Sequence, residues 1–183
     1  MIRGVALAVA LALAAARAAA QDTPPAPEQA VKAAYLLSFT RYVEWPAVAF
    51  PDSAAPVNIC VVGDEAQALP DVVRLTIEGR RSRGRPVRLL RPDAPEHVRD
   101  CHLVFLPAQI RSIDGWLASL RTTSVLTVGE GAEFLQRGGM ISFVIREQTI
   151  RFLINDEAAR AAGLRISSRL LALALRPAAG APR

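Results

Sequence analysis

Continuous apolar runs, separated by segments with helical spacing, limit the folds open to this chain. Three such runs are bounded by turn residues and occupy residues 57–62, 101–106 and 125–128. A run of this kind is typical of a strand buried on both faces. Residues 86–90 predict a further strand, and helices are predicted at 65–73 and 113–120. The alternation indicates βαβ units, and therefore an α/β fold: a three-layer αβα sandwich around a mostly parallel sheet.

The C-terminal part departs from this alternation. Residues 140–145 and 149–154 alternate in part between apolar and smaller or polar side chains, with only three residues between them. This pattern predicts a β-hairpin, which we expect to extend an edge of the sheet. Two short helices follow. We expect Asp156 to cap the first, which ends at Gly163, and Ser167 or Ser168 to cap the second.

The N-terminal residues 1–20 have the composition of a secretory signal peptide. Arg3 precedes an Ala/Leu/Val run that ends in three alanines, so we expect cleavage near Ala20. The run is short and interrupted by Arg17, which suits export better than an uncleaved membrane anchor. The expected organisation is a signal peptide, a proline-rich linker, a single α/β domain and a disordered tail, at residues 1–20, 21–27, 28–176 and 177–183. The mature protein is therefore predicted to act outside the cytoplasm.

The charge balance argues against a dedicated nucleic-acid-binding domain. The chain carries 22 basic and 17 acidic residues, and two arginines leave with the signal peptide, so the mature excess is only +3. Residues 80–88 contain five arginines and no carboxylate. This stretch could bind phosphates or acidic lipid headgroups, but a solvated loop that leads into a strand is the preferred interpretation. We predict no nucleic-acid partner.

Cys60 and Cys101 are the only cysteines. An even number of cysteines in an exported chain predicts one disulfide. The alternative is a metal site that adds His97 and His102 to the two thiols. The long interval between the cysteines matches no common zinc spacing, so we predict neither a metal nor a cofactor.

The candidate catalytic residues form one cluster, in which His97 and His102 flank Asp100 and Cys101. No nucleophile elbow is present, and neighbouring residues in a strand point to opposite faces of the sheet. The chain is therefore predicted not to be an enzyme.

Ligands of parallel α/β sheets bind beyond the carboxyl ends of the strands. A candidate ligand crevice therefore lies at the loops that follow the predicted strands. Its residues are Gly63, Asp64, Gln109 and Gly129. These loops lack the glycine pattern of a pyrophosphate site and the lysine of a nucleotide hydrolase loop.

The segment 28–45 predicts an amphipathic helix that Pro46 ends. It contains much of the aromatic surface of the chain. Packing against the sheet is the default interpretation, and an exposed surface for interaction with a partner is the more specific alternative. The residues of this candidate surface are Tyr35, Phe39, Tyr42 and Trp45.

Several segments, taken in order, resemble the periplasmic YfiR family. They are VKAAYL (31–36), VEWP (43–46), ICVVG (59–63), CHLVF (101–105), GGMISF (138–143), RFLIN (151–155) and LRISSRLL (164–171). Each segment alone is weak, but their order and the paired cysteines make the combined match specific. The resemblance covers nearly the whole mature chain.

This resemblance implies a periplasmic protein that represses an inner-membrane diguanylate cyclase by contacting its periplasmic portion, and so lowers cyclic-di-GMP and biofilm formation. It implies a homodimer that an outer-membrane lipoprotein can sequester. It also places the family's inter-strand disulfide on Cys60 and Cys101. A second cysteine pair of some members is absent here, which puts redox sensing through that pair in doubt. The alternative function is a periplasmic sensor domain that binds a small ligand.

Overall fold

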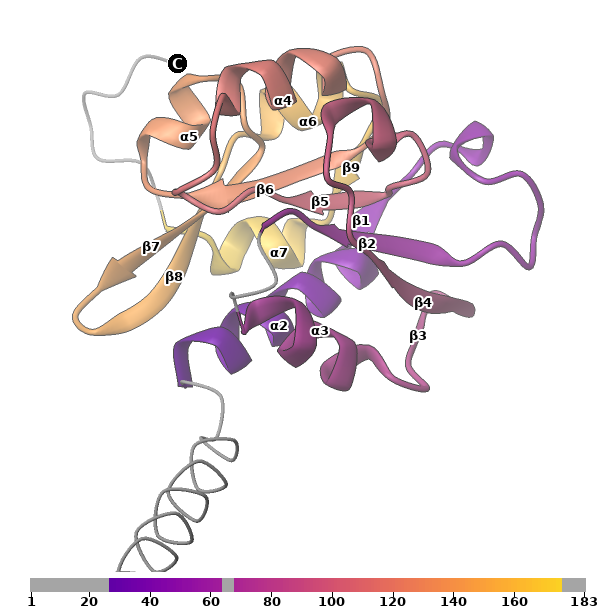
Figure 1. Ribbon diagram of the computed structural model, residues 1–183, viewed down its shortest axis with the longest axis horizontal. Helices are drawn as coiled ribbons and strands as arrows, with labels where there is room; N and C mark the ends of the chain where they lie inside the picture. Colours follow the sequence, from indigo (N-terminus) through magenta and orange to yellow (C-terminus); the bar gives the residue numbers. More distant parts are fainter. Residues whose placement is uncertain (1–26, 64–67, 176–183) are drawn as a thin grey trace, which may run out of the picture.

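Strands and helices alternate along the chain and build one central sheet. The computed structural model describes residues 27–63 and 68–175, and seven strands within these ranges form the sheet (Figure 1). In chain order they are β2 (Val57–Val61), β3 (Arg81–Ser82), β4 (Arg85–Leu90), β5 (Leu103–Phe105), β6 (Leu126–Glu130), β7 (Ile141–Arg146) and β8 (Thr149–Ile154). Across the sheet their order is β3-β4-β2-β5-β6-β7-β8. The strands from β4 to β7 in this order are parallel, and β3 and β8 run antiparallel at the two edges.

Helices cover both faces of the sheet. They are α2 (Pro27–Tyr42), α3 (Leu69–Ile77), α4 (Ile113–Leu120), α5 (Glu133–Gln136), α6 (Asp156–Ala161) and α7 (Ser168–Leu173), with short 3-10 helices η1 (Ala47–Ala49) and η2 (Pro95–Val98). Helices α2 and α3 pack in a first core cluster, and α4 and α5 pack in a second. Side-chain alternation along β2 divides the clusters, because Ile59 and Val61 enter the first while Cys60 and Val62 enter the second. The predicted three-layer α/β sandwich is confirmed.

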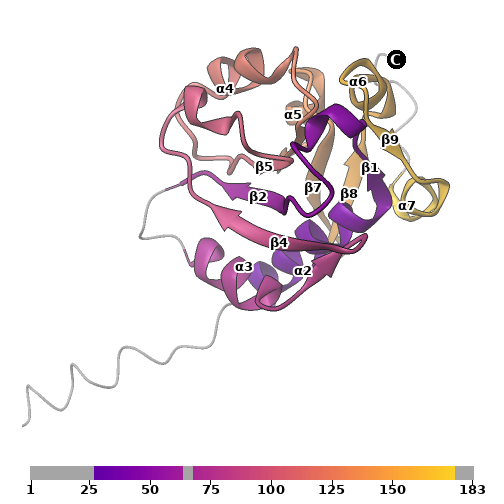
Figure 2. The ribbon, with the colours of Figure 1, turned by 90° about the vertical axis from the view of Figure 1, so that its right-hand side faces the viewer.

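The C-terminal hairpin lies at the sheet edge, as predicted. Strands β7 and β8 pair in register, with Phe143 opposite Phe152. Glu147 and Gln148 form the turn with positive φ angles of 50° and 59°. Beyond the hairpin, α6, β9 (Arg165–Ile166) and α7 follow one another at this end of the molecule (Figure 2).

Several predicted boundaries differ from the structure. The first helix ends at Tyr42 instead of Trp45, because β1 (Val43–Glu44) leaves it to pair antiparallel with β9. Asn155, and not the predicted Asp156, caps α6: the Asn155 side chain accepts a hydrogen bond from the Ala158 N–H at 3.0 Å. Ser167 caps α7, which confirms one of the two predicted caps.

The arginine-rich stretch is a short hairpin and not a simple loop. Strands β3 and β4 pair antiparallel at the sheet edge. Ser82 is fully buried between its arginine neighbours, and its hydroxyl donates to the Thr40 carbonyl of α2 at 2.8 Å. Charged side chains on an edge strand discourage pairing with other chains, which is a sufficient structural reason for this composition. The predicted helix at 65–73 begins at Leu69 within the described residues and extends to Ile77.

Candidate functional site

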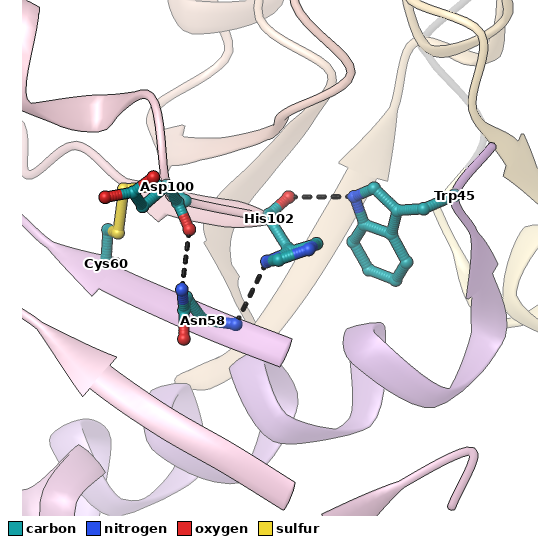
Figure 3. The surroundings of a disulfide bond; sticks show 6 residues. Trp45, Asn58, Cys60, Asp100 and His102 are labelled. Carbon is teal, nitrogen blue, oxygen red and sulfur yellow. Dashed lines mark hydrogen bonds between the residues drawn. A yellow bond between two sulfur atoms is a disulfide. The ribbon is translucent and has the colours of Figure 1, made fainter. Parts of the chain in front are cut away.

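The cysteines of β2 and of the segment before β5 are bonded. Cys60 and Cys101 form the predicted disulfide, with their Cα atoms 5.8 Å apart (Figure 3). Both residues are buried in the second core cluster, at 0% and 4% exposure. Their neighbours shield the bond from solvent, so it acts as a structural crosslink.

His102 lies directly beside this disulfide and joins three parts of the fold. Its Nδ1 accepts the backbone N–H of Asn58 at 3.1 Å, and its Nε2 lies 3.0 Å from the Ala49 carbonyl oxygen. A carbonyl can only accept, so Nε2 carries the hydrogen and the ring is neutral. The indole Nε1–H of Trp45 donates to the His102 carbonyl at 3.0 Å (Figure 3). Burial lowers the pKa of His102, and the hydrogen bond to Ala49 partly opposes this shift.

This arrangement gives His102 a structural role. Both ring nitrogens already have backbone partners, and Cys101 is held in the disulfide. His97 belongs to η2 and pairs with Asp93 at the surface, where Nδ1 lies 2.6 Å from the carboxylate. The histidine–cysteine cluster of the sequence is therefore not assembled as a catalytic centre.

Phe50 packs against His102 and carries a cation on its ring. The Phe50 and His102 rings stack with their centroids 4.4 Å apart. The Arg85 guanidinium lies 3.9 Å from the Phe50 centroid, a cation–π contact. Arg85 also donates to the carbonyl oxygens of Asp52 and Ala55, at 2.8 and 2.9 Å. These contacts attach the segment between η1 and β2 to the sheet.

A cavity of about 220 Å³ opens beside these groups. Its lining combines aromatic, hydroxyl and charged side chains: Thr40, Glu44, Trp45, Phe50, Val57, Ser82, Arg83 and Arg85. Glu44 accepts hydrogen bonds from Arg83 at 3.1 Å and from Arg165 at 2.8 Å, and these two guanidinium groups hold its pKa below the usual range. Aromatic walls with a cationic rim suit a small ligand that has an apolar body and a polar or anionic group.

A second, largely apolar cavity of about 360 Å³ lies between α2 and the C-terminal hairpin. Phe143, Ile145 and Ile150 supply much of its apolar wall. At its base, Lys32 binds the carboxylates of Glu28 and Glu130. Burial lowers the pKa of Lys32, but the hydrogen bonds that its ammonium group donates to the two glutamates, together with their negative charges, outweigh burial, and the pKa is raised. The ion pairs therefore tie α2 to the carboxyl end of β6.

The predicted ligand crevice does not coincide with either cavity. Gly129 lies within β6, where a Cβ atom would come within 2.4 Å of the Phe134 ring, so the ring covers the position. Gly63 and Gln109 follow β2 and β5 but line neither of the two cavities described here. Asp64 lies outside the described residues. Gly129 therefore cannot line an open crevice, because the Phe134 ring occupies the space next to it.

The predicted aromatic surface is largely core. Phe39 is 0% exposed, and its ring stacks on Phe143 at 5.9 Å, so it presents no surface to a partner. Tyr35 packs against Phe152, with the ring centroids 5.3 Å apart. Tyr42 and Trp45 are partly buried against the first core cluster, and Trp45 also lines the smaller cavity. Interaction through Tyr35, Tyr42 or Trp45 stays a prediction.

Sequence reasoning missed the role of Phe50 and Arg85. Arg85 lies in the arginine-rich stretch, but nothing in the sequence pairs it with Phe50, an isolated aromatic residue between two prolines that belongs to no periodic pattern. Within residues 27–63 and 68–175, no group of three histidine, cysteine or acidic residues could hold a metal ion. No helix in the same ranges is long and apolar enough to cross a membrane.

Comparison with known proteins supplies the family. A conserved domain protein from Vibrio cholerae, of solved structure, is 14% identical, with a TM-score of 0.48 over 64% of this chain. The chain spans about half of that protein, covering 53% of its length. No curated protein matches the chain. A family model described as YfiR/HmsC-like matches residues 29–175, from α2 to the segment after α7. Because this match takes in nearly all of the described fold, the chain belongs to the YfiR/HmsC-like family.

Proposed function

We propose that this protein is a periplasmic repressor of an inner-membrane diguanylate cyclase, which it inhibits by contact and so lowers cyclic-di-GMP and biofilm formation. Its family membership carries the proposal, because the YfiR/HmsC-like family suggests a periplasmic regulator and not an enzyme. The buried Cys60–Cys101 disulfide supports export, since such bonds persist in oxidising compartments. Cleavage of the first twenty residues near Ala20 belongs to the same proposal.

A regulator of this kind acts only through differential affinity. A protein that binds two states of an enzyme equally well shifts nothing, however tightly it binds. Full repression from a mostly active population requires about 10⁴-fold tighter binding to the inactive state, or about 5.5 kcal/mol. The proposed contact surface must therefore fit one conformation of the periplasmic portion of the cyclase.

The partly buried aromatic residues of α2 and its exit are the proposed contribution to this contact. Tyr42→Ala is expected to weaken repression more than it lowers the melting temperature. Phe39→Ala is the matched control on the same helix, because Phe39 is fully buried and its loss lowers stability and repression together. Equal losses of stability and repression in both variants would assign Tyr42 to packing alone.

The direct experiment reconstitutes the cyclase in proteoliposomes and titrates it with the purified mature protein. Cyclic-di-GMP synthesis should fall to a plateau, and deletion of the gene in cells should raise cyclic-di-GMP. A thermally unfolded sample serves as the control for non-specific inhibition. Synthesis that stays constant at saturating protein would contradict the proposal. Addition of the periplasmic portion of an outer-membrane lipoprotein is expected to restore synthesis, and sedimentation is expected to show a homodimer.

A small-ligand sensor is the second candidate, and the 220 Å³ cavity favours it. A ligand there would contact Trp45 and Phe50 and face Arg83. Native mass spectrometry of protein purified from the periplasm should then show the additional mass of a bound ligand. This additional mass should be absent from the spectrum of the Phe50→Ala variant. A spectrum with only the apo mass, at both high and low protein concentration, would argue against this candidate.

A further inference from the structure

We propose that His102 is a pH-sensitive latch: its neutral ring holds residues 47–55 against the sheet, and protonation of the ring releases them. The inference is independent of the proposed function, because it concerns how this segment is attached. The observations that carry it are the partners of the two ring nitrogens and the packing of Phe50 on the ring.

The observed hydrogen bonds are possible only when the His102 ring is neutral. Nδ1 must be an acceptor, because its partner at 3.1 Å is the backbone N–H of Asn58. A protonated imidazole carries hydrogens on both nitrogens, so two N–H groups would point at each other across this distance. The ring must then move away from β2 or leave the Asn58 N–H without its partner. Protonation is therefore coupled to displacement of the ring.

Displacement of the ring loosens the segment that it supports. Nε2–H donates to the Ala49 carbonyl, and the Phe50 ring stacks on the imidazole. The other attachment shown is Arg85, which donates to Asp52 and Ala55. Among residues 47–55 only Ala55 is buried. A segment with so few buried contacts opens at low free-energy cost once one attachment is lost.

The charged groups around the ring set the direction of the response. Arg85 from β4 disfavours a second positive charge, whereas Asp100 favours it. Asp52 belongs to the segment itself, and its carboxylate accepts the N–H groups of Ala54 and Ala55. Because burial and Arg85 lower the pKa of His102, the latch stays closed at neutral pH and opens on acidification.

Opening changes the surface next to the smaller cavity. Phe50 is one wall of that cavity, so its departure enlarges the opening beside Trp45. Val48, already 89% exposed at the tip of η1, moves with it. An exported protein would thereby respond to the acidity of its compartment through one buried histidine.

The test follows the Asn58 amide and the His102 ring by NMR between about pH 7.5 and pH 5. Corrected for intrinsic exchange, protection of the Asn58 amide should fall by up to about tenfold per pH unit as the pH drops from the ordinary histidine pKa to the His102 midpoint, and it should level off below that midpoint. The amide signals of residues 47–55 should change with the same midpoint. That midpoint should lie below the ordinary histidine value.

Two variants separate the latch from general acid unfolding. His102→Asn can keep an acceptor for Asn58 but does not titrate, so its Asn58 protection should be independent of pH in this range. His97→Asn removes the exposed histidine and should behave as the wild type. If wild-type protection does not change with pH, or if the change persists in His102→Asn, the proposal is wrong. Should His102→Asn fail to fold, unequal midpoints for the His102 ring and residues 47–55 in the wild type overturn it, and equal midpoints support it.

Discussion

Removal of the disulfide offers the sharpest quantitative test of how this fold is stabilised. The bond joins residues separated by 41 positions. On the chain-entropy relation, a loop of this length restricts the unfolded chain by about 4 kcal/mol at 25 °C. A domain of this size loses roughly 2–4 °C in Tm for each kcal/mol. The double variant Cys60→Ala/Cys101→Ala should therefore melt about 8–16 °C lower than the oxidised protein.

The assays are thermal melting and urea unfolding of the variant and of the wild type with and without reductant. Reduced wild type keeps both sulfur atoms in the second core cluster, so it separates the lost crosslink from the lost packing. The m-value should rise in both crosslink-free samples, because an open chain exposes more surface when it unfolds. Variant and reduced wild type should lose similar amounts of unfolding free energy.

Two results would refute this reasoning. One is a loss below about 1 kcal/mol in both crosslink-free samples, which would mean that the loop constrains the unfolded chain far less than the relation requires. The other is the recovery of two free thiols from protein purified out of the periplasm. If the protein is a repressor, the variant should also raise cyclic-di-GMP in cells, because less folded protein is present.

The other predictions concern packing and charge. Gly129→Ala should destabilise the protein by about 1–3 kcal/mol, because the new Cβ would meet the Phe134 ring at 2.4 Å. Gly115→Ala in α4 should instead stabilise it by about 0.5–1 kcal/mol, because the only close atom is Ser112 Oγ at 2.9 Å, the end of a side chain that can rotate away. Shifts of the same sign in thermal melts of the two variants would contradict the steric argument. Lys32→Met should lower the free energy of unfolding in urea by about 1–3 kcal/mol, because it leaves the half-buried Glu130 carboxylate without its cation. Adding Glu130→Gln should recover part of this free energy. No recovery in the double variant would count against the ion pair as the source of the stability.

The candidate site could be predicted from the sequence only in part. Cys60 and Cys101 were recognisable because two cysteines have only one possible pairing within the chain, and the structure contains that bond. Phe39 was recognisable as aromatic and large, and its pattern favoured the core but also fitted an interface. Only the stacking on Phe143 from the C-terminal hairpin assigns it to the core. Gly129 was placed in a loop, whereas it lies in a strand beneath Phe134.

The sequence by itself determined the layers of this protein, the edge hairpin and the single crosslink. These depend on local properties: the period of apolar residues, turn chemistry and the number of cysteines. Tertiary structure alone decided where α2 ends, since β1 leaves it for a strand more than a hundred residues away. It likewise decided that His102 stays neutral, because Asn58 and Ala49 meet its two nitrogens from distant segments. Contacts between residues remote in sequence have no periodic signature, and only the folded chain brings them together.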